Sequence, residues 1–207
     1  MVLLKPLKKW VDLQYQSPSG ILGLYFGEKM VLQHQPETLW TIELLKLRHE
    51  ERVLEIGCGA GYAIKKVLLH PHVQFVAGLD ISTSVLRSAK LRNRQSLRKG
   101  TAEVLLGNVS DIPLDNESFT KVFSIHSLYF WDVSSQTVSE LYRVLKPNGT
   151  VTLTICNGKD GETWTGVQSM VEELLIPLMI QTGFKDVKIV KGPSSRGYHT
   201  IAVGGGK

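Results

Sequence analysis

The chain has few cysteines and lacks any long apolar run. Its two cysteines, Cys58 and Cys156, are too few for a disulfide framework, so we interpret both as free thiols in a reducing compartment. The apolar stretch that follows Met1 is too short for a signal peptide, and no run is long enough to cross a membrane. These absences predict a cytoplasmic protein.

Patterns typical of metal sites and of single-strand nucleic-acid binding are also missing. The six histidines show no metal-ligand spacing, so no metal site is expected. The net charge is +5, yet no aromatic residue interleaves with the basic run from Arg87 to Lys99, so a stacking platform for single strands is absent. We interpret this run first as a solvated helix face, and a phosphate-binding face stays open as the alternative.

Strand and helix patterns alternate along most of the chain, whose 207 residues suffice for one α/β domain. We expect strands at 52–56, 74–79, 102–106, 119–125 and 150–155, and helices at 33–47, 60–69, 82–99 and 134–145. A helix at 163–182, broken by Pro177, precedes short strands at 187–190 and 198–203 and a flexible tail at 204–207. Ser82 is expected to cap the basic helix, and Lys146 to Gly149 form a strong turn signal.

This order of elements predicts a doubly wound, Rossmann-like sheet of about seven strands, mostly parallel because helices connect them. The last two strands are joined by a short loop without a helix, so one antiparallel strand is expected near the C-terminus. We expect a single domain at 33–207. An N-terminal extension at 1–32, with Tyr15, Tyr25 and Phe26, is expected to form a lid over a binding pocket.

The turn after the first strand carries the clearest functional signal. Gly57, Gly59 and Gly61 stand between a buried strand and a helix, where glycine lets backbone approach a ligand and the helix N–H groups point into the same space. The dinucleotide pattern Gly-x-Gly-x-x-Gly would need a glycine at Tyr62. Glu55 would sit poorly beside a pyrophosphate but well beside a sulfonium or an ammonium, so a nicotinamide dehydrogenase is disfavoured.

Polar groups also follow the other strands. Ligands of open α/β sheets bind beyond the carboxyl ends of the strands. Asp80 ends the second strand and can accept hydrogen bonds from both hydroxyls of a ribose. The third strand ends at Gly107-Asn108-Val109 and the fourth at Ser124-Ile125-His126. The four strand ends together predict one ligand site.

Several of these segments resemble one known family. Val53 to Tyr62 resembles motif I of the class I S-adenosylmethionine-dependent methyltransferases, and Leu79 to Ser82 resembles their ribose-binding motif. Their adenine-site segment is similar to Gly107 through Leu114 with Ser118-Phe119, and their Leu-Lys-Pro-Gly-Gly turn is similar to Leu145 through Gly149. Gly183-Phe184 fits their C-terminal part. The resemblance covers roughly residues 35–203 and is strongest to the small-molecule methyltransferases that include quinone-biosynthesis enzymes.

The resemblance implies S-adenosylmethionine as cofactor and S-adenosylhomocysteine as product. It also implies a role for each motif residue. The turn residues Gly57, Cys58, Gly59 and Gly61 would line the methionine part, with Glu55 orienting its amino end. Asp80 would hold the ribose with Ile81 against the adenine, Asn108 and Val109 would contact the adenine edge, and His126 would face the methyl-transfer region.

One motif residue departs from the family pattern, and another carries a thiol. Asn108 stands where the family usually has Asp, which predicts a modest loss of cofactor affinity because an amide accepts without charge assistance. Asp111 is a candidate substitute for that acid. Cys58 is interpreted as a small turn residue, since no histidine or basic group stands beside it in the sequence to activate a thiol.

The segment after the fourth strand narrows the choice of methyl acceptor. There is no Asn-Pro-Pro-Tyr or Asp-Pro-Pro-Tyr motif for planar amines and no Pro-Cys pair for cytosine, whereas residues 124–132 are apolar and aromatic. We therefore expect a small, partly apolar methyl acceptor. Alignment of the reactants is the main task, and a general base is needed only if the acceptor must lose a proton. His126 is the first candidate base and Tyr129 the second.

Two further functions stay open from the sequence alone. A nucleic-acid or protein methyltransferase would use the basic helix at 87–99 as a docking face. A non-catalytic S-adenosylmethionine-binding protein would keep the cofactor motifs with a decayed acceptor site, as the departure at Asn108 would allow.

Overall fold

The computed structural model describes residues 31–207. The expected lid belongs to residues 1–32, and all but its last two residues lie outside the described part of the chain. Among residues 31–207, no helix is both long enough and apolar enough to span a membrane.

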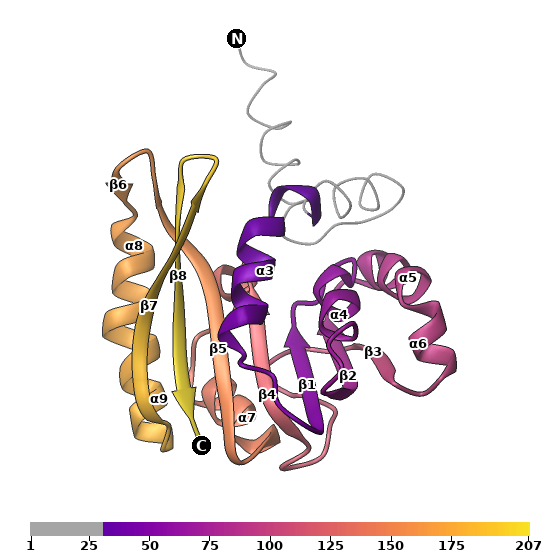
Figure 1. The fold of residues 1–207 in the computed structure, drawn as a ribbon. Coiled ribbons are helices and arrows are strands. Elements are labelled where there is room, and N and C mark those ends of the chain that lie inside the picture. The colour runs from indigo at the N-terminus through magenta and orange to yellow at the C-terminus, as the bar shows by residue number, and fades with distance from the viewer. Residues whose placement is uncertain (1–30) are drawn as a thin grey trace.

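The described chain forms one mixed sheet with the strand order β3-β2-β1-β4-β5-β8-β7 (Figure 1). Strands β1 to β5 are parallel, and β8 runs antiparallel between β5 and β7. The short β6 pairs antiparallel with β5. These strands are β1 (Glu51–Ile56), β2 (Val73–Asp80), β3 (Ala102–Leu106), β4 (Phe119–Ile125), β5 (Leu145–Lys159), β6 (Glu162–Thr163), β7 (Lys185–Ser195) and β8 (Tyr198–Gly206). The predicted Rossmann-like, mostly parallel sheet is confirmed.

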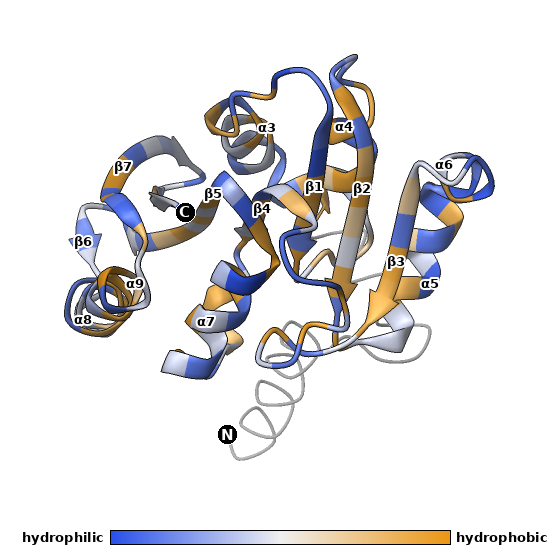
Figure 2. Ribbon diagram, turned by 90° about the horizontal axis from the view of Figure 1, so that it is seen from below, coloured by the Kyte–Doolittle hydropathy of each residue, from blue (hydrophilic) through white to orange (hydrophobic). Residues whose placement is uncertain are grey.

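Helices cover both faces of this sheet. The helical elements are α3 (Gln35–Leu44), α4 (Tyr62–Val67), α5 (Thr83–Arg92), α6 (Arg94–Arg98), η1 (Leu128–Phe130), α7 (Ser135–Val144), α8 (Thr165–Ser169), the π-helical η2 (Met170–Leu175) and α9 (Ile176–Thr182). The core residues of α7, η2 and α9 pack on one face, and those of α4 and α5 pack on the other. Figure 2 shows β2 as mostly hydrophobic, as a parallel strand buried on both faces requires, and α6 as mostly hydrophilic.

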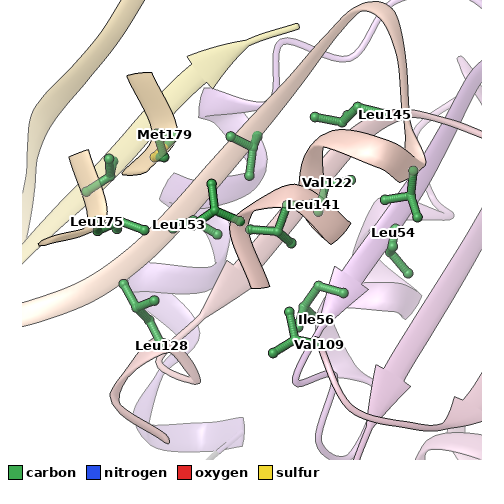
Figure 3. Close-up of a cluster of buried hydrophobic side chains, with 14 of the residues drawn as sticks. Leu54, Ile56, Val109, Val122, Leu128, Leu141, Leu145, Leu153, Leu175 and Met179 are labelled. Atoms are coloured by element: carbon green, nitrogen blue, oxygen red, sulfur yellow. The ribbon is translucent and has the colours of Figure 1, made fainter. Parts of the chain in front are cut away.

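The two core clusters follow from the alternation of side chains along each strand. On β1, Leu54 and Ile56 enter the cluster with α7, η2 and α9, whereas Val53 enters the cluster with α4 and α5. On β4, Val122 belongs to the cluster with α7, η2 and α9, and Phe123 belongs to the cluster with α4 and α5. Figure 3 shows the first cluster, which also contains Val109, Leu128, Leu141, Leu145, Leu153, Leu175 and Met179.

The helix expected at 82–99 is interrupted at Asn93, which separates α5 from α6. The amide of Asn93 donates to the carbonyls of Ala89 and Gly61, and a side chain that bonds back four residues competes with helix continuation. Ser82 occupies the N-cap position of α5, as expected, with extended backbone and a carbonyl that accepts from the N–H of Leu86. The helix expected at 163–182 is interrupted next to Pro177, because the π-helical η2 ends at Leu175 and α9 begins at Ile176, with Pro177 in its first turn, where a missing N–H costs little.

The C-terminal tail was predicted to be flexible, and this was wrong. Gly204, Gly205 and Gly206 belong to β8 and pair with β5, while Gly204 and Gly206 also pair with β7. The Nζ of Lys207 donates to the carbonyls of Tyr142 and Leu145. Glycine fits here because a Cβ at Gly205 would lie 3.0 Å from the Cε of Met179. Hydrogen bonds from neighbouring strands therefore order a segment whose own residues favour disorder.

The Lys146–Gly149 turn signal lies within β5, as an irregularity in its pairing with β4. Phe119 pairs with Leu145 and Lys121 with Thr150, so the extra residues of β5 are accommodated there. Asn148 has a φ of 65°, and its N–H donates to the carbonyl of Lys207. The turn residues thus provide the positive φ of a bulge and do not end the strand.

Candidate active site

The carboxyl ends of β1, β2, β3 and β4 open onto one cavity of about 680 Å³. The sequence-predicted residues that line it are Glu55, Gly57, Cys58, Gly59, Asp80, Ile81, Asn108, Val109, His126 and Tyr129. Four segments far apart in the chain are thereby brought to one place, as the crevice rule for open α/β sheets predicts. Gly61 and Asp111 are not among the lining residues.

The glycine turn presents its backbone to this cavity. Gly57 has a φ of 72° and donates its N–H to the carbonyl of Leu79 over 2.8 Å. A Cβ at Gly57 would lie 2.3 Å from the Cβ of Ser127, so no larger residue fits. Gly59 has a φ of 49°, and a Cβ there would meet no atom within 4 Å. The turn is therefore packed at Gly57 and open to the cavity at Gly59.

Gly61 lies at a close contact between two helices. A Cβ at this position would lie 2.9 Å from the Cα of Ala89 and 2.6 Å from the Nδ2 of Asn93. The amide of Asn93 also donates to the carbonyl of Gly61 over 2.9 Å. Gly61 thus permits close packing between the start of α4 and α5, and the expected contact with the cofactor lacks support because Gly61 is outside the cavity wall.

Asp80 connects the glycine turn to the end of β2. Its Oδ2 accepts from the N–H of Gly59 over 2.8 Å, and its Oδ1 accepts from the N–H of Ser82 over 2.9 Å. Burial raises the pKa of Asp80, and these backbone N–H groups oppose that rise. A carboxylate has about four acceptor positions, so capacity remains for hydroxyl donors from the cavity.

Glu55 is buried in the cavity wall. Burial is the main cause that raises its pKa well above the ordinary value, the charge of Asp80 adds to this, and the N–H of Ile64 opposes it. The Oε2 of Glu55 is buried without a hydrogen-bond partner among the described residues. A buried acceptor without a partner is costly, and a cationic N–H donor in the cavity would relieve that cost.

Cys58 also lines the cavity, but its thiol is not set up for reaction. Burial is the largest cause that raises the pKa of Cys58, followed by the charges of Glu55 and Asp80. Because the thiolate is the nucleophilic form, this environment makes the sulfur inert. The interpretation of Cys58 as a small turn residue agrees with the structure.

Residues that follow β2 and β3 add apolar side chains to the cavity wall. Ile81 is 58% exposed and Val109 is buried, and both line the cavity. The Oδ1 of Asn108 accepts from the N–H of Ser110 over 3.1 Å, so this oxygen also stabilises its own turn. Asp111 does not replace the missing acid, because it is not a lining residue.

Arg143 and Glu140 of α7 hold the segment after β3 in place. The guanidinium of Arg143 donates to the carbonyls of Ile112 and Leu114, and Glu140 accepts from the N–H of Ile112 over 2.8 Å. Arg143 and Glu140 also form an ion pair. Sequence reasoning missed both residues because they act on the cavity only through the segment that they hold.

His126 lies at the end of β4 with a φ of 56°, a conformation that few residues other than glycine adopt. Burial is the main cause that lowers its pKa to about 3, and nearby His34 and Arg196 contribute. The ring is therefore neutral at physiological pH, and such a low pKa makes it a weak proton acceptor. Its Nε2 is buried and has no partner among the described residues.

The hydroxyl of Tyr129 is fully engaged with the backbone of β5. It donates to the carbonyl of Cys156 over 2.7 Å and accepts from the N–H of the same residue. Burial is the largest cause that raises its pKa. The geometry therefore gives no support to Tyr129 as a base, and this residue forms an aromatic wall stacked parallel to His126.

Several cavity residues were not predicted from the sequence. Thr38 of α3 and His34, the N-cap residue of this helix, line the cavity, and the hairpin of β7 and β8 contributes Arg196 and Tyr198. Trp164, which precedes α8, also lines the cavity. None belongs to a recognisable motif. The residues of α3 and of the hairpin come together because α3 packs against β4, β5 and β7 and because β8 pairs with β5.

The orientation of α3 differs from the expectation. Its apolar spacing predicted a helix, which is confirmed, but the buried residues are Glu37, Thr38 and Thr41. Leu39 is 46% exposed. The hydroxyl of Thr41 lies 2.8 Å from that of Thr154 on β5, in a buried contact. A helix that turns its polar side inward is usually serving a site, since burial of polar groups is costly.

The basic run lies on α5 and α6, and Arg92 is its member that contacts the glycine turn. Arg87, Lys90, Arg94 and Arg98 are exposed. Arg92 is half-buried and donates to the carbonyl of Ala60. The exposed bases agree with a solvated face, and a docking role for them is untested.

Comparison with known proteins supports the motifs. Residues 54–153 match a family model described as a methyltransferase domain. An uncharacterized methyltransferase, YdaC of Bacillus subtilis, is 26% identical over 79% of this chain and 87% of its own length. Two plant proteins match about half of this chain at 28% identity. These are 24-methylenesterol C-methyltransferase 2 of Arabidopsis thaliana, over 29% of its length, and 2-methyl-6-phytyl-1,4-hydroquinone methyltransferase 1 of Oryza sativa, over 31% of its length.

Solved structures confirm the fold. A putative methyltransferase in complex with the Trm112 activator of Haloferax volcanii superposes with a TM-score of 0.70 at 18% identity, covering 87% of this chain and 92% of the other. At this level of identity the similarity concerns the arrangement of the elements.

Proposed function

Because this chain is a class I S-adenosylmethionine-dependent methyltransferase, we propose that its methyl acceptor is a small, partly apolar molecule bound beside His126. The observation that carries this proposal is the composition of the cavity wall. We call the part lined by the glycine turn and Asp80 the cofactor half, or first half, and the part lined by five aromatic side chains the acceptor half, or second half. These are Tyr129, Phe130, Trp131, Trp164 and Tyr198.

The first half fits S-adenosylmethionine group by group. The Oε2 of Glu55, which lacks a partner among the described residues, would accept from the ammonium of the methionine part. Asp80 would accept from the ribose hydroxyls, and exposed Ile81 would pack against the adenine. The open space at Gly59 leaves room for the chain of the methionine. When bound, this cofactor supplies an electrophilic methyl group on a sulfonium.

The second half favours an acceptor with an apolar body. Aromatic side chains bind apolar rings and chains through large buried contact areas. Two relatives are named for acceptors of this character, a methylenesterol and a phytyl-hydroquinone. Their names support an apolar acceptor for this chain and do not identify it.

The residues of this chain contribute mainly by alignment. Tyr129 is fixed by its two backbone hydrogen bonds and holds one wall of the acceptor half. Neutral His126 would accept a hydrogen bond from an acceptor hydroxyl and orient its oxygen toward the cofactor half. The aromatic wall excludes water, which strengthens such contacts. Alignment of this kind supplies most of what a methyl transfer needs.

Calorimetry of S-adenosylmethionine binding tests the cofactor half. We expect Asp80→Ala to weaken binding by at least about 10-fold, or about 1.4 kcal/mol, because charge-assisted hydrogen bonds to the ribose are lost. Asp111→Ala is the matched control, since Asp111 lies outside the cavity wall. NAD should not bind. Equal affinity of the two variants would contradict the assignment of Asp80.

Transfer of a labelled methyl group tests the acceptor half. The parent protein is incubated with labelled cofactor and, separately, with prenylated hydroquinones, sterols, RNA and a basic protein. We expect label in the apolar small molecules. Label found only in RNA or in protein would refute the proposal and favour docking through the basic residues of α5 and α6.

A further inference from the structure

Three side chains with metal-binding atoms converge at the acceptor end of the cavity. His34 and Glu37 stand three residues apart at the start of α3, and His126 follows β4. One ligand atom from each lies within 4.8 Å of the others. His34 and His126 also line the cavity. Their spacing along the chain did not predict this cluster, because α3 and the end of β4 meet only in the folded protein.

Two polar atoms of these three side chains lack hydrogen-bond partners among the described residues. The side chain of Glu37 is 0% exposed, its Oε1 lies 3.5 Å from the Nη2 of Arg196, and its Oε2 is buried without a partner. The Nε2 of His126 is also buried without a partner. Buried polar atoms normally find partners, so two such atoms in one cluster indicate a ligand that binds both.

The surrounding structure positions these ligands. The hydroxyl of Thr41 donates to the carbonyl of Glu37 over 2.7 Å and contacts Thr154 of β5, which fixes the helix that carries Glu37. The N–H of His126 donates to the carbonyl of the same Thr154 over 2.8 Å. Thr154 therefore links both parts of the cluster, and His126 is held at a φ of 56°. Strained backbone of this kind is concentrated at functional sites.

We propose that His34, Glu37 and His126 form a binding site for a divalent transition-metal ion, with zinc as the ion that fits best. Two imidazoles and one carboxylate are the ligand set of many zinc sites that keep a fourth position open. The same set suits ferrous iron. Magnesium and calcium prefer oxygen ligands and fit poorly. The open position would face the cavity, because both histidines line it.

Arg196 competes with the metal ion for Glu37. Its Nη2 lies 3.5 Å from Oε1 of Glu37 and 3.4 Å from Nδ1 of His34. Its side chain is 37% exposed near the end of the hairpin between β7 and β8, so it can withdraw into solvent when a dication binds. Metal binding thus exchanges one cationic partner of Glu37 for another.

A metal ion here would bind the oxygen of an acceptor hydroxyl and lower its pKa, so that its proton passes to water and the oxygen keeps the electron pair for attack on the methyl group; this step rests on the proposed function. His126 would then act as a ligand, which agrees with its weakness as a base. Binding of the metal itself does not depend on methyl transfer, so the two can be tested separately.

Cobalt titration of the full-length protein tests the site. The protein is treated with a chelator, exchanged into chelator-free buffer, and titrated with Co²⁺ while visible absorption is recorded; Zn²⁺ competition is then measured by calorimetry. We expect one strong Co²⁺ site that Zn²⁺ displaces. His34→Ala, Glu37→Gln and His126→Ala should each weaken binding by at least about 10-fold. Arg196→Ala should strengthen it, because the competing cation is removed.

His72→Ala is the matched control. His72 belongs to a second histidine group with His49 and His70, whose rings lie 4.2 and 5.3 Å from that of His72. Near-ultraviolet circular dichroism checks that each variant is folded, and Glu37→Gln keeps the shape of the side chain. No Co²⁺ binding at about 1 mM would overturn the proposal. Binding lost in His72→Ala but kept in the three ligand variants would overturn it as well.

The cobalt titration and the methyl-transfer assay, read together, distinguish this proposal from the proposed function. Co²⁺ bound at the site by a protein that methylates none of the tested acceptors would leave the metal site standing and refute the acceptor class. Methyl transfer to a hydroquinone by a protein that binds no Co²⁺ would refute the metal site alone.

Discussion

Alanine substitutions at Gly59, Gly61 and Gly100 separate three effects that a glycine can have. All three positions have positive φ, of 49°, 72° and 71°. An alanine in this conformation costs about 1–2 kcal/mol relative to glycine, whatever the surroundings. The surroundings differ, because a Cβ at Gly59 or Gly100 meets no atom within 4 Å, whereas a Cβ at Gly61 meets the backbone of Ala89 at 2.9 Å.

Stability should therefore rank the three variants. Gly59→Ala and Gly100→Ala should each lose about 1–2 kcal/mol, which lowers the melting temperature by about 2–8 °C in a chain of this size. Gly61→Ala should lose a further 1–3 kcal/mol or so, because α4 must move away from α5. Urea denaturation followed by circular dichroism measures the difference.

Cofactor affinity should rank them differently. Gly59 lines the cavity and Gly100 does not, so only the Cβ at Gly59 occupies space that the methionine part would need. We expect Gly59→Ala to weaken S-adenosylmethionine binding by at least about 10-fold, or about 1.4 kcal/mol, while Gly100→Ala binds as the parent does. The reasoning fails if Gly59→Ala and Gly100→Ala bind equally well, or if Gly61→Ala is no less stable than Gly100→Ala.

Three further substitutions test other parts of the site. Burial and Asp80 raise the pKa of Glu55, so the folded protein keeps a proton that the unfolded chain releases, and stability falls as pH rises between the two values. Thermal melts of Glu55→Gln should therefore depend less on pH above 4.5 than those of the parent, and an unchanged dependence would contradict this. Tyr129→Phe leaves the N–H and carbonyl of Cys156 without their partner, so urea titration should show a loss of about 1–3 kcal/mol with unchanged cofactor affinity. Arg143→Ala removes the hydrogen bonds to the carbonyls of Ile112 and Leu114, so calorimetry should show weaker binding of the cofactor. Unchanged affinity would mean that these two residues hold their positions without Arg143.

Much of the cofactor half could be predicted because its signals are local. The glycine spacing, the acid at Asp80 and the alternation of strands with helices are each written in a short window of sequence. The positive φ of Gly57 favours glycine, and parallel strands bring their carboxyl ends to one edge. The predicted residues therefore converge on one cavity in the folded protein.

The acceptor half could not be predicted in the same way. Helix α3 carries apolar residues at helical spacing, but its buried side holds Glu37, Thr38 and Thr41. Which side turns inward depends on the polar partner that β5 provides at Thr154, and no local pattern contains that information. Tyr129 was a reasonable base by type, and only its hydrogen bonds to Cys156 remove it from that role.

The sequence by itself determined the order of the elements, the glycine turn and the acid that follows the second strand, because backbone dihedrals and side-chain periodicity act over a few residues. Tertiary structure decided that Gly61 packs one helix against another, that the glycines before Lys207 form a strand, and that His34, Glu37 and His126 meet. These outcomes depend on which distant segments supply hydrogen bonds and contacts, and that pairing is set by the packing of the whole domain.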